Sequence, residues 1–458
     1  MLENSEQNAK IIPKIIDYFD SIIYIITKEN TMDYIKRIID KDLDLRSKAF
    51  NAIQIVGPKG CGKTRTAKER CKTIIEFEDE EKRNSYLLLA DTSPSSFFLN
   101  QKPILFDEWQ DAPKIWGAVR KNCDDNPEDS GSYYLTGSTS KEVDTPHTGT
   151  LRISTVEMSP MSLYESGDSN GDISLSELFD KKQITKMSES KLDIPELIYV
   201  CCRGGWPRSL YPTDKNAKLL IAKDSYKQII NKDISSIDGI KRNPDWAAAI
   251  IKSYARNIGT LCKKSILYND AKGTFGFSED TYDTYLDKLK ELYVVKDYDA
   301  WCPQIRSEKS LRAPKKHMFI DPSVAIAALG LKPEYFLQDF DLFGHIFESL
   351  VYRDLNVYSM ALGGSLSHYH DTYDLEVDAV LHLEDGRYAL IEIKLGNKDI
   401  KKGIANLLKV KELIIEHNKK PDVLKIREPD LMMVITGHGI SYESEEGVFV
   451  IPISCLKD

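Results

Sequence analysis

A glycine-rich loop constrains this chain of 458 residues more than any other stretch of its sequence. The segment AIQIVGPKGCGKTRTAKERC places an apolar run before the pattern G-x-x-x-x-G-K-T, which extends from Gly57 to Thr64, and a segment of helical character after it. Because Gly57, Gly60 and Gly62 have no side chain, backbone N–H groups and the N-terminus of the helix can approach phosphate oxygens closely. The sequence therefore predicts a strand, a phosphate-binding loop and a helix.

The residues of this loop, a complete Walker A motif, have separate predicted roles. Lys63 is expected to contact the β- and γ-phosphates of a nucleotide, and the hydroxyl of Thr64 to ligate Mg²⁺. Cys61 is interpreted as a small residue of the loop, with redox control as the alternative. A glycine turn that binds nothing is disfavoured by the complete motif in its strand-loop-helix context. The residues expected to contact the nucleotide here are Gly57, Pro58, Lys59, Gly60, Cys61, Gly62, Lys63, Thr64 and Arg65.

Two adjacent carboxylates follow a short apolar run further downstream, in KPILFDEWQDAP. At the end of a Walker B strand, Asp107 is predicted to hold Mg²⁺ and Glu108 to activate the attacking water as a general base. Another strand, in SYYLTGSTSKE, ends in small hydroxyl residues, and Thr136 or Ser138 is expected to contact the γ-phosphate. Together the three segments predict ATP and Mg²⁺ as cofactors and ATP hydrolysis as the reaction.

A later arginine, Arg152 in GTLRISTVEMSPMSLYE, is a candidate for stabilising the charge of the transferring phosphoryl group. An arginine at the start of a strand is also commonly a surface cation, so both interpretations stay open. The sequence does not decide whether such an arginine acts within its own subunit or on a neighbouring one.

The order of these motifs resembles that of AAA+ ATPases, in particular a prokaryotic group that joins a P-loop ATPase to a C-terminal region of unknown function. The segments that carry the resemblance are GPKGCGKT, ILFDEWQ, YYLTGS, LR…SPMSLYE and GGWP, in this order. In related signalling ATPases a glycine-x-proline turn lies near the adenine, which implies this position for Gly205 and Pro207 in RGGWPRSL. A tight turn against a buried Trp206 explains the same residues without a ligand.

The middle of the chain predicts a winged helix. Three helical segments, WAAAIIKSYARNIGTLC, KSILYNDA and SEDTYDTYLDKLKELY, precede two strands, VVKDYDAW and KHMFID, and Ser278 is the expected N-cap of the third helix. The loop between the strands is basic and is expected to contact a nucleic-acid backbone. Its basic residues are Arg306, Lys309, Arg312, Lys315 and Lys316. The acidic third helix is unsuited to a major groove, so a plain packing module stays the alternative.

The C-terminal part follows the order helix, three strands, helix, strand. Glu348 lies on the first helix, Asp378 on the second strand, and Glu392 and Lys394 on the third, ALIEIKLG. In an extended strand alternate side chains share a face, so Glu392 and Lys394 point the same way. This order and these four residues resemble the PD-(D/E)XK nuclease fold. Glu376, earlier on the second strand, is interpreted as an opposite-side neighbour.

The resemblance implies a metal-dependent nuclease site. It implies that Glu348, Asp378 and Glu392 hold Mg²⁺, while Lys394 orients or deprotonates the attacking water or stabilises the scissile phosphate. His368 and His370 share a strand face, but without a third ligand they are not expected to bind a metal. The alternative is a degenerate binding module in which the carboxylate of Glu392 and the ammonium of Lys394 form an ion pair.

Composition limits the class of protein and its compartment. With 41% hydrophobic and 29% charged residues, the chain can bury several cores, and charges interrupt its most apolar N-terminal stretch, SIIYIITKENTMDYIKRIID. No membrane span or signal peptide is expected, so a cytoplasmic protein is predicted. The eight cysteines are scattered without C-x-x-C spacing, which argues against a zinc site. The net charge of −9 argues against indiscriminate nucleic-acid binding.

We therefore predict a multidomain α/β chain of four parts. They are an N-terminal helical segment (1–40), an AAA+ P-loop ATPase domain with a small helical part (41–235), a winged helix (236–335) and a PD-(D/E)XK nuclease-like αβββαβ domain (336–458). The predicted function is ATP hydrolysis that controls a Mg²⁺-dependent nuclease-like domain acting on nucleic acid, with DNA as the expected substrate. The alternative is an ATP-driven switch or assembly protein whose last domain is an inactive binding module. A homo-oligomer is compatible with either function.

Overall fold

The structure is a computed structural model that describes residues 33–137, 149–184, 186–273, 275–302, 314–371 and 375–458. The chain divides into two compact units, residues 1–36 and residues 37–458. Of the first unit only residues 33–36 are described, and they form no helix or strand. The predicted N-terminal helical segment lies for the most part outside the described residues. All elements named below belong to the second unit.

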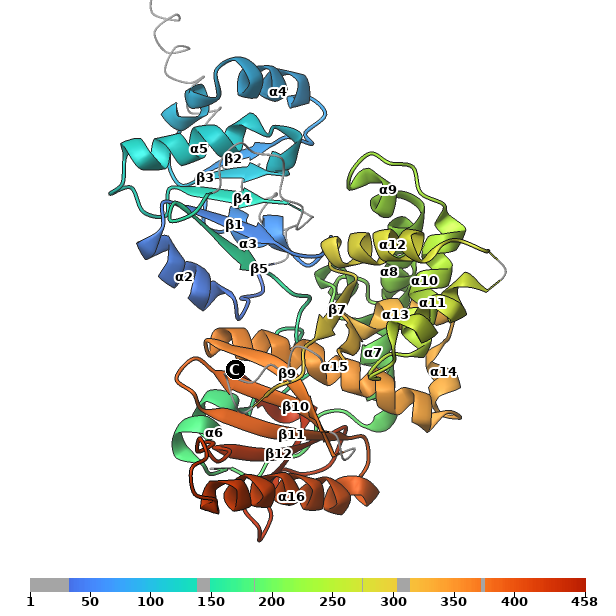
Figure 1. The fold of residues 1–458 in the computed structure, drawn as a ribbon. Helices are drawn as coiled ribbons and strands as arrows, with labels where there is room; N and C mark the ends of the chain where they lie inside the picture. Colours follow the sequence, from blue (N-terminus) through green and yellow to red (C-terminus); the bar gives the residue numbers. More distant parts are fainter. Residues whose placement is uncertain (1–32, 138–148, 185, 274, 303–313, 372–374) are drawn as a thin grey trace, which may run out of the picture. The chain divides into compact units, whose positions relative to one another are not determined.

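A five-stranded parallel sheet carries the phosphate-binding loop (Figure 1). Its strand order is β2-β3-β4-β1-β5. The strands are β1 (Ala52–Val56), β2 (Thr73–Glu76), β3 (Ile104–Asp107), β4 (Tyr133–Thr136) and β5 (Ile153–Glu157). Because β4 lies between β1 and β3, Thr136 is in register with both Ile55 and Asp107. The C-terminal ends of these three strands therefore meet at one edge of the sheet.

Helices cover both faces of this sheet, which explains why most residues of its central strands are apolar and buried. They are α2 (Asp40–Ala49), α3 (Lys63–Lys68), α4 (Arg83–Thr92) and α5 (Lys114–Asp125). Buried residues of α4 and α5 pack with Phe106 and Leu135, whereas those of α2 and α3 pack with Ile55 and Leu105. The result is the mixed α/β architecture with a parallel P-loop sheet that the sequence predicts.

Short helices connect this sheet to the rest of the chain. They are α6 (Leu175–Lys181), α7 (Ile194–Arg203), α8 (Lys215–Gln228), a π-helical turn (Ile229–Asp233) and α9 (Ile234–Ser236). Before α6, the two-residue strand β6 (Ile173–Ser174) pairs in parallel with β15 (Leu456–Lys457) near the C-terminus. Segments far apart in the sequence thus share one core, which includes residues from Leu163 to Leu456.

The middle of the chain has the predicted order of elements: α10 (Pro244–Arg256), α11 (Lys264–Lys272), α12 (Glu279–Glu291) and an antiparallel pair, β7 (Val295–Tyr298) and β8 (Lys316–Phe319). The Ser278 hydroxyl accepts the N–H of Thr281, as expected of an N-cap. Two short helices follow, α13 (Pro322–Leu329) and α14 (Pro333–Phe336). The identification as a winged helix stays a prediction.

The basic loop expected between β7 and β8 is only partly described. Arg306, Lys309 and Arg312 lie outside the described residues. Lys315 is half exposed and pairs with Asp299. Lys316 does not belong to an exposed wing, because its side chain is only 1% exposed and faces carboxylates of the C-terminal domain. The predicted nucleic-acid contact of Lys316 is therefore wrong.

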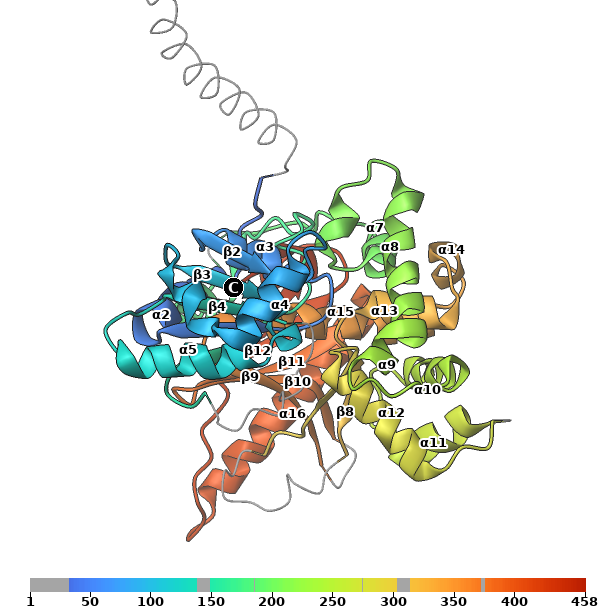
Figure 2. The same cartoon turned by 90° about the horizontal axis from the view of Figure 1, so that it is seen from above.

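The C-terminal domain shows the predicted order of helix, three strands, helix and strand (Figure 1 and Figure 2). The helices are α15 (Phe340–Ala361) and α16 (Ile400–Lys419). A six-stranded sheet has the order β13-β14-β12-β11-β10-β9. Its strands are β9 (Gly364–His370), β10 (Glu376–Leu383), β11 (Tyr388–Lys394), β12 (Leu431–Thr436), β13 (Tyr442–Glu443) and β14 (Phe449–Pro452). The two helices pack on opposite faces of the sheet. Likeness to PD-(D/E)XK nucleases stays a prediction.

Helix length and polarity bear on the membrane prediction. Within the described part of the chain, no helix combines the length and the apolar composition that crossing a membrane requires.

A buried ion cluster fastens α15 to two other segments. The guanidinium of Arg353 lies 3.0 Å from Asp321 Oδ2 and 2.7 Å from Asp354 Oδ1, and all three side chains are almost fully buried. The backbone N–H of Gly205 donates to Asp321, and that of Leu163 donates to Asp354. Each carboxylate thus holds both the arginine and a separate loop.

Replacement of Arg353 tests this arrangement. We expect Arg353→Met to lower the free energy of unfolding by about 3–5 kcal/mol, because two buried carboxylates lose their only charged partner in the cluster. Arg427→Met is the matched control, since Arg427 is half exposed and pairs with Asp430 at the surface; we expect a change of at most about 1 kcal/mol. Equal losses in chemical denaturation would contradict the assigned role of the cluster.

Candidate functional site

The phosphate-binding loop is held closely against the neighbouring strand. A Cβ atom on Gly57 would lie 2.2 Å from the carbonyl oxygen of Met158, just after β5, so only glycine fits there. Gly62, at the start of α3, has a φ of 109°, a conformation that favours glycine. The ammonium of Lys63 donates to the carbonyl oxygens of Gly57 and Pro58, each at 2.9 Å. Lys63 therefore folds back over its own loop.

Two hydroxyl groups converge on the predicted metal ligand. Thr64 Oγ1 donates to Asp107 Oδ1 at 2.8 Å, and the hydroxyl of Thr136 donates to the same oxygen. These are hard oxygen ligands, so Thr64 and Asp107 fit the Mg²⁺ that accompanies a bound nucleotide. The register of β4 explains the position of Thr136. Its predicted contact with the γ-phosphate stays a prediction, and the alternative residue, Ser138, lies outside the described residues.

The predicted general base, Glu108, is held by a residue that sequence reasoning missed. Glu108 adopts a left-handed backbone conformation, with a φ of 50°, directly after β3. Its carboxylate accepts a hydrogen bond from the side-chain amide of Gln110. The spacing of two residues after the acid is the one signal in the sequence that points to Gln110.

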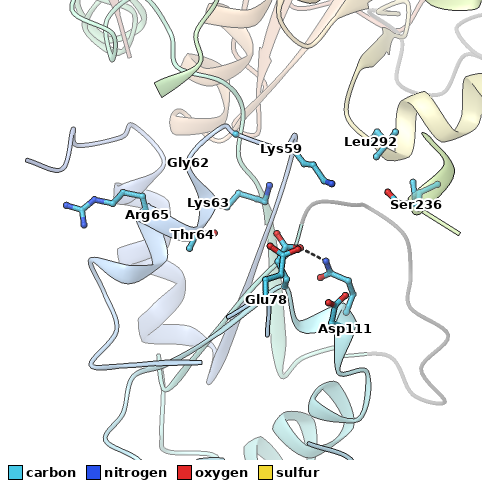
Figure 3. A pocket seen from close by; sticks show the side chains of 13 residues that line it. Lys59, Gly62, Lys63, Thr64, Arg65, Glu78, Asp111, Ser236 and Leu292 are labelled. Carbon is cyan, nitrogen blue, oxygen red and sulfur yellow. Dashed lines mark hydrogen bonds between the residues drawn. The ribbon is translucent and has the colours of Figure 1, made fainter. Parts of the chain in front are cut away.

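A cavity of about 610 Å³ lies beside the loop, a volume typical of small-molecule sites (Figure 3). Its lining residues are Lys59, Gly60, Gly62, Lys63, Thr64, Arg65, Glu78, Glu108, Gln110, Asp111, Ser236, Ile237 and Leu292. Two carboxylates missed by sequence reasoning, Glu78 and Asp111, thus lie near Glu108. Burial raises the pKa of Glu78, and the nearby charges of Glu108 and Asp111 raise it further. Residues from α9 onward complete the cavity.

Lys59 and Pro207 connect the loop to the helices beyond the sheet. Lys59 Nζ lies 2.8 Å from Asp233 Oδ1, on the π-helical turn. A Cβ on Gly62 would lie 3.5 Å from Pro207 Cγ, so Pro207 is next to the loop. Trp206 is buried and donates to the Ser323 hydroxyl at 3.0 Å. Both the tight turn and its proximity to the loop are present, and contact with adenine stays a prediction.

Arg152 lies at the opposite edge of the sheet from the cavity. It precedes β5, whose first residue is in register with Ala52, whereas the phosphate-binding loop follows Val56 at the other end of β1. Its Nε lies 2.6 Å from Asp124 Oδ1. The structure therefore does not bring Arg152 to the phosphate site of its own subunit. A role towards a neighbouring subunit stays a prediction.

The C-terminal sheet brings together three of the four residues predicted there. Lys394 Nζ lies 2.9 Å from Asp378 Oδ2 and 2.6 Å from Glu392 Oε2. Asp378 Oδ2 also accepts the backbone N–H of Ile393, and Glu392 Oε1 accepts the amide of Asn406 on α16 at 2.6 Å. Asn406 is a further residue that sequence reasoning missed. Lys394 thus bridges two carboxylates.

A second lysine joins Glu348 to this group. Lys316 Nζ lies 2.6 Å from Glu348 Oε1 and 3.0 Å from Glu376 Oε1. It also donates to the carbonyl oxygen of Asp378 at 3.2 Å. Glu376 therefore faces the cluster, and its interpretation as an opposite-side neighbour is wrong, because Lys316 from β8 brings its carboxylate into the group. We call Lys316, Glu348, Glu376, Asp378, Glu392 and Lys394 the carboxylate–lysine cluster.

Burial and like charges perturb this cluster. Burial and the neighbouring Asp378 raise the pKa of Glu392 to about 7. Burial raises the pKa of Glu348 to about 7 against the opposing effect of Lys316. Although burial opposes ionisation of Asp378, the charges of Lys316 and Lys394 hold the pKa of its carboxyl below the usual value.

The described arrangement of the cluster does not fit the expected metal ion. Ammonium groups lie between the carboxylates, and among the described residues no set of three or more His, Cys, Asp or Glu side chains is placed to hold a metal. The predicted metal ligands Glu348, Asp378 and Glu392 therefore hold lysines in this conformation.

Comparisons with known proteins identify three segments. Residues 49–166 match the model of an AAA domain, residues 194–335 a domain of unknown function (DUF8612), and residues 343–456 another (DUF4143). No curated protein matches. Among solved structures, the Walker-type ATPase PABY2304 of Pyrococcus abyssi is similar at 14% identity, with 66% of this chain and 96% of that chain covered and a TM-score of 0.38. The family model supports an AAA-type P-loop ATPase domain.

His368 gives a prediction about pH. Burial, together with the nearby charge of Lys316, lowers the pKa of its imidazole from 6.5 to about 4. Between these values the unfolded chain binds the proton and the folded chain does not, so stability falls as the pH is lowered from 6.5 towards 4. We expect His368→Phe to remove a loss of up to about 3 kcal/mol over this range, measured by urea denaturation. His370→Phe controls for the added ring; an unchanged pH slope in His368→Phe would contradict the assignment.

Proposed function

We propose that this chain is an ATP-hydrolysing switch, in which the AAA domain binds and cleaves ATP and thereby changes the state of the C-terminal domain. The single observation that supports hydrolysis best is that Lys63, Thr64 and Glu108 line one cavity and that Asp107 accepts the hydroxyl of Thr64 beside it. A binding site without chemistry would not require a carboxylate such as Glu108 beside the metal ligand.

Each residue of the site has a defined task in the proposed reaction. Lys63 exchanges the loop carbonyls of Gly57 and Pro58 for phosphate oxygens, which are stronger acceptors because they are charged. Thr64 and Asp107 hold Mg²⁺, which neutralises charge on the phosphates when it is bound. Glu108, oriented by Gln110, accepts a proton from the attacking water.

Two variants test this assignment. We expect Lys63→Ala to abolish binding of a fluorescent ATP analogue, because the phosphates lose their cation. We expect Glu108→Gln to bind the analogue as the wild type does but to reduce phosphate release about 100-fold or more, because the general base is lost. Wild-type turnover in both variants would refute ATP hydrolysis at this site.

A second candidate function is nucleic-acid cleavage by the C-terminal domain. The observation that favours it is the convergence of Asp378, Glu392 and Lys394, three residue types of the predicted nuclease motif, on adjacent strands. DNA is the proposed substrate and RNA the alternative. Because the described cluster does not fit a metal ion, we derive no catalytic step from it.

Cleavage assays decide between this candidate and an inactive binding module. Labelled single- and double-stranded DNA and RNA are incubated with Mg²⁺ or Mn²⁺, with and without ATP. We expect cleavage by the wild type and its loss in Asp378→Ala and Lys394→Ala, because each removes part of the cluster. Absence of cleavage in every condition, together with intact ATP hydrolysis, would refute the nuclease and leave a binding module.

A further inference from the structure

The most unusual charged group outside the phosphate site is Lys316. It belongs to β8, in the middle region, but its ammonium is buried among carboxylates of α15 and β10. Its three N–H donors have three acceptors, Glu348 Oε1 at 2.6 Å, Glu376 Oε1 at 3.0 Å and the carbonyl oxygen of Asp378 at 3.2 Å. The ring of Tyr352, whose centroid is 5.8 Å away, adds a further surface attractive to a cation.

We propose that Lys316 is a built-in cation that occupies a position suited to a divalent metal, between the oxygens of Glu348, Glu376 and the Asp378 carbonyl, and keeps the metal out. This inference rests on the second candidate function, because it concerns regulation of the same site. It accounts for part of the misfit between the motif and the conformation. Of the three expected metal ligands, Glu348 gives its carboxylate and Asp378 its backbone carbonyl to the ammonium of Lys316. The carboxylates of Asp378 and Glu392 are held by Lys394.

The charges of the cluster favour an exchange of cations. The cluster contains four carboxyl groups and two ammonium groups, so carboxyl groups outnumber cations. A divalent ion in place of the Lys316 ammonium would carry twice its charge. Oxygen ligands from carboxylates and a backbone carbonyl are also those that Mg²⁺ and Mn²⁺ prefer. The negative charge of the carboxyl groups is therefore compensated better when the lysine leaves and a divalent ion enters.

The hairpin of β7 and β8 connects Lys316 to the phosphate-binding loop. Lys316 is in register with Tyr298 of β7, and Lys296 of the same strand lies 3.0 Å from Glu157 Oε1. Glu157 ends β5 and is in register with Val56, the residue before the loop. A displacement of β5 on nucleotide binding would thus move the hairpin that carries Lys316. The nucleotide state is the proposed signal for its withdrawal.

Metal binding by full-length, nucleotide-free protein tests whether the ammonium of Lys316 keeps a divalent metal out. Free Mn²⁺ is measured by electron paramagnetic resonance for the wild type, Lys316→Met and Lys315→Met. We expect Lys316→Met to gain one Mn²⁺ site that is about tenfold tighter or more than any in the wild type, because the competing ammonium is absent. Lys315→Met, altered at the neighbouring exposed lysine, should bind as the wild type does. The phosphate site is unaltered in all three proteins, and Mn²⁺ binding there serves as the internal reference.

Thermal unfolding gives a second readout that does not depend on activity. Lys316→Met should unfold at a lower temperature than the wild type in EDTA and recover in Mn²⁺, since the metal replaces the lost charge. If Lys316→Met does not fold in EDTA, Mn²⁺ binding is measured instead on the double variant Lys316→Met/Glu376→Gln. This variant loses one charge of each sign, so its buried charges stay closer to balance. No additional Mn²⁺ site in either variant would overturn the inference and leave Lys316 as a structural ion-pair partner.

Chemical labelling tests the link to the nucleotide. Acetylation by an N-hydroxysuccinimide ester, followed by mass spectrometry, compares Lys316 with its exposed neighbour Lys315. We expect protection of Lys316 without nucleotide and labelling with Mg²⁺-ATP in Glu108→Gln, where ATP persists. Continued protection of Lys316 would overturn its withdrawal by nucleotide. Loss of nucleic-acid cleavage in all assays, with the Mn²⁺ gain intact, would refute the nuclease and not the cation exchange.

Discussion

Compensation of buried charge is the constraint on which the rest of this structure depends. An ionised group taken out of water is costly unless an opposite charge and hydrogen bonds replace its hydration. Arg37 shows the consequence: it pairs with Glu165, and its guanidinium also donates to the carbonyl oxygen of Cys61 in the phosphate-binding loop at 2.8 Å. Arg353 does the same for two loops and α15. Buried ion pairs thus hold loops that lie outside the helices and strands.

The same constraint gives the two candidate sites different character. At the phosphate site Lys63 donates to two neutral carbonyl oxygens, which a charged phosphate can displace at a net electrostatic gain. In the carboxylate–lysine cluster each lysine already contacts ionisable carboxyl groups, so an incoming ion must compete with a charge of the same sign. The phosphate site can therefore accept an anion, whereas the carboxylate–lysine cluster already contains two cations, Lys316 and Lys394.

Much of the architecture follows from local sequence patterns. The apolar runs before Gly57, Asp107 and Thr136 are parallel strands whose ends meet, as the complete phosphate-loop motif and the carboxylates after the second run predicted. The order of α15, β9 to β11, α16 and β12 was also predictable from alternation and helical periodicity. Lys316 was not: a basic residue near a loop is usually solvated, and no local pattern shows that carboxylates 32 and 60 residues later surround it.

The sequence by itself determined the phosphate-binding loop and the order of strands and helices, since these depend on residues close together in the chain. Tertiary structure alone decided which charges meet. It brought the hydroxyl of Thr136 into a hydrogen bond with Asp107 and paired Arg152 with Asp124, at the edge of the sheet away from the phosphate site. It also placed the ammonium of Lys316 between Glu348 and Glu376. The physical reason is that the energy of a charge inside a protein depends on its neighbours in space, which the packing of distant segments supplies.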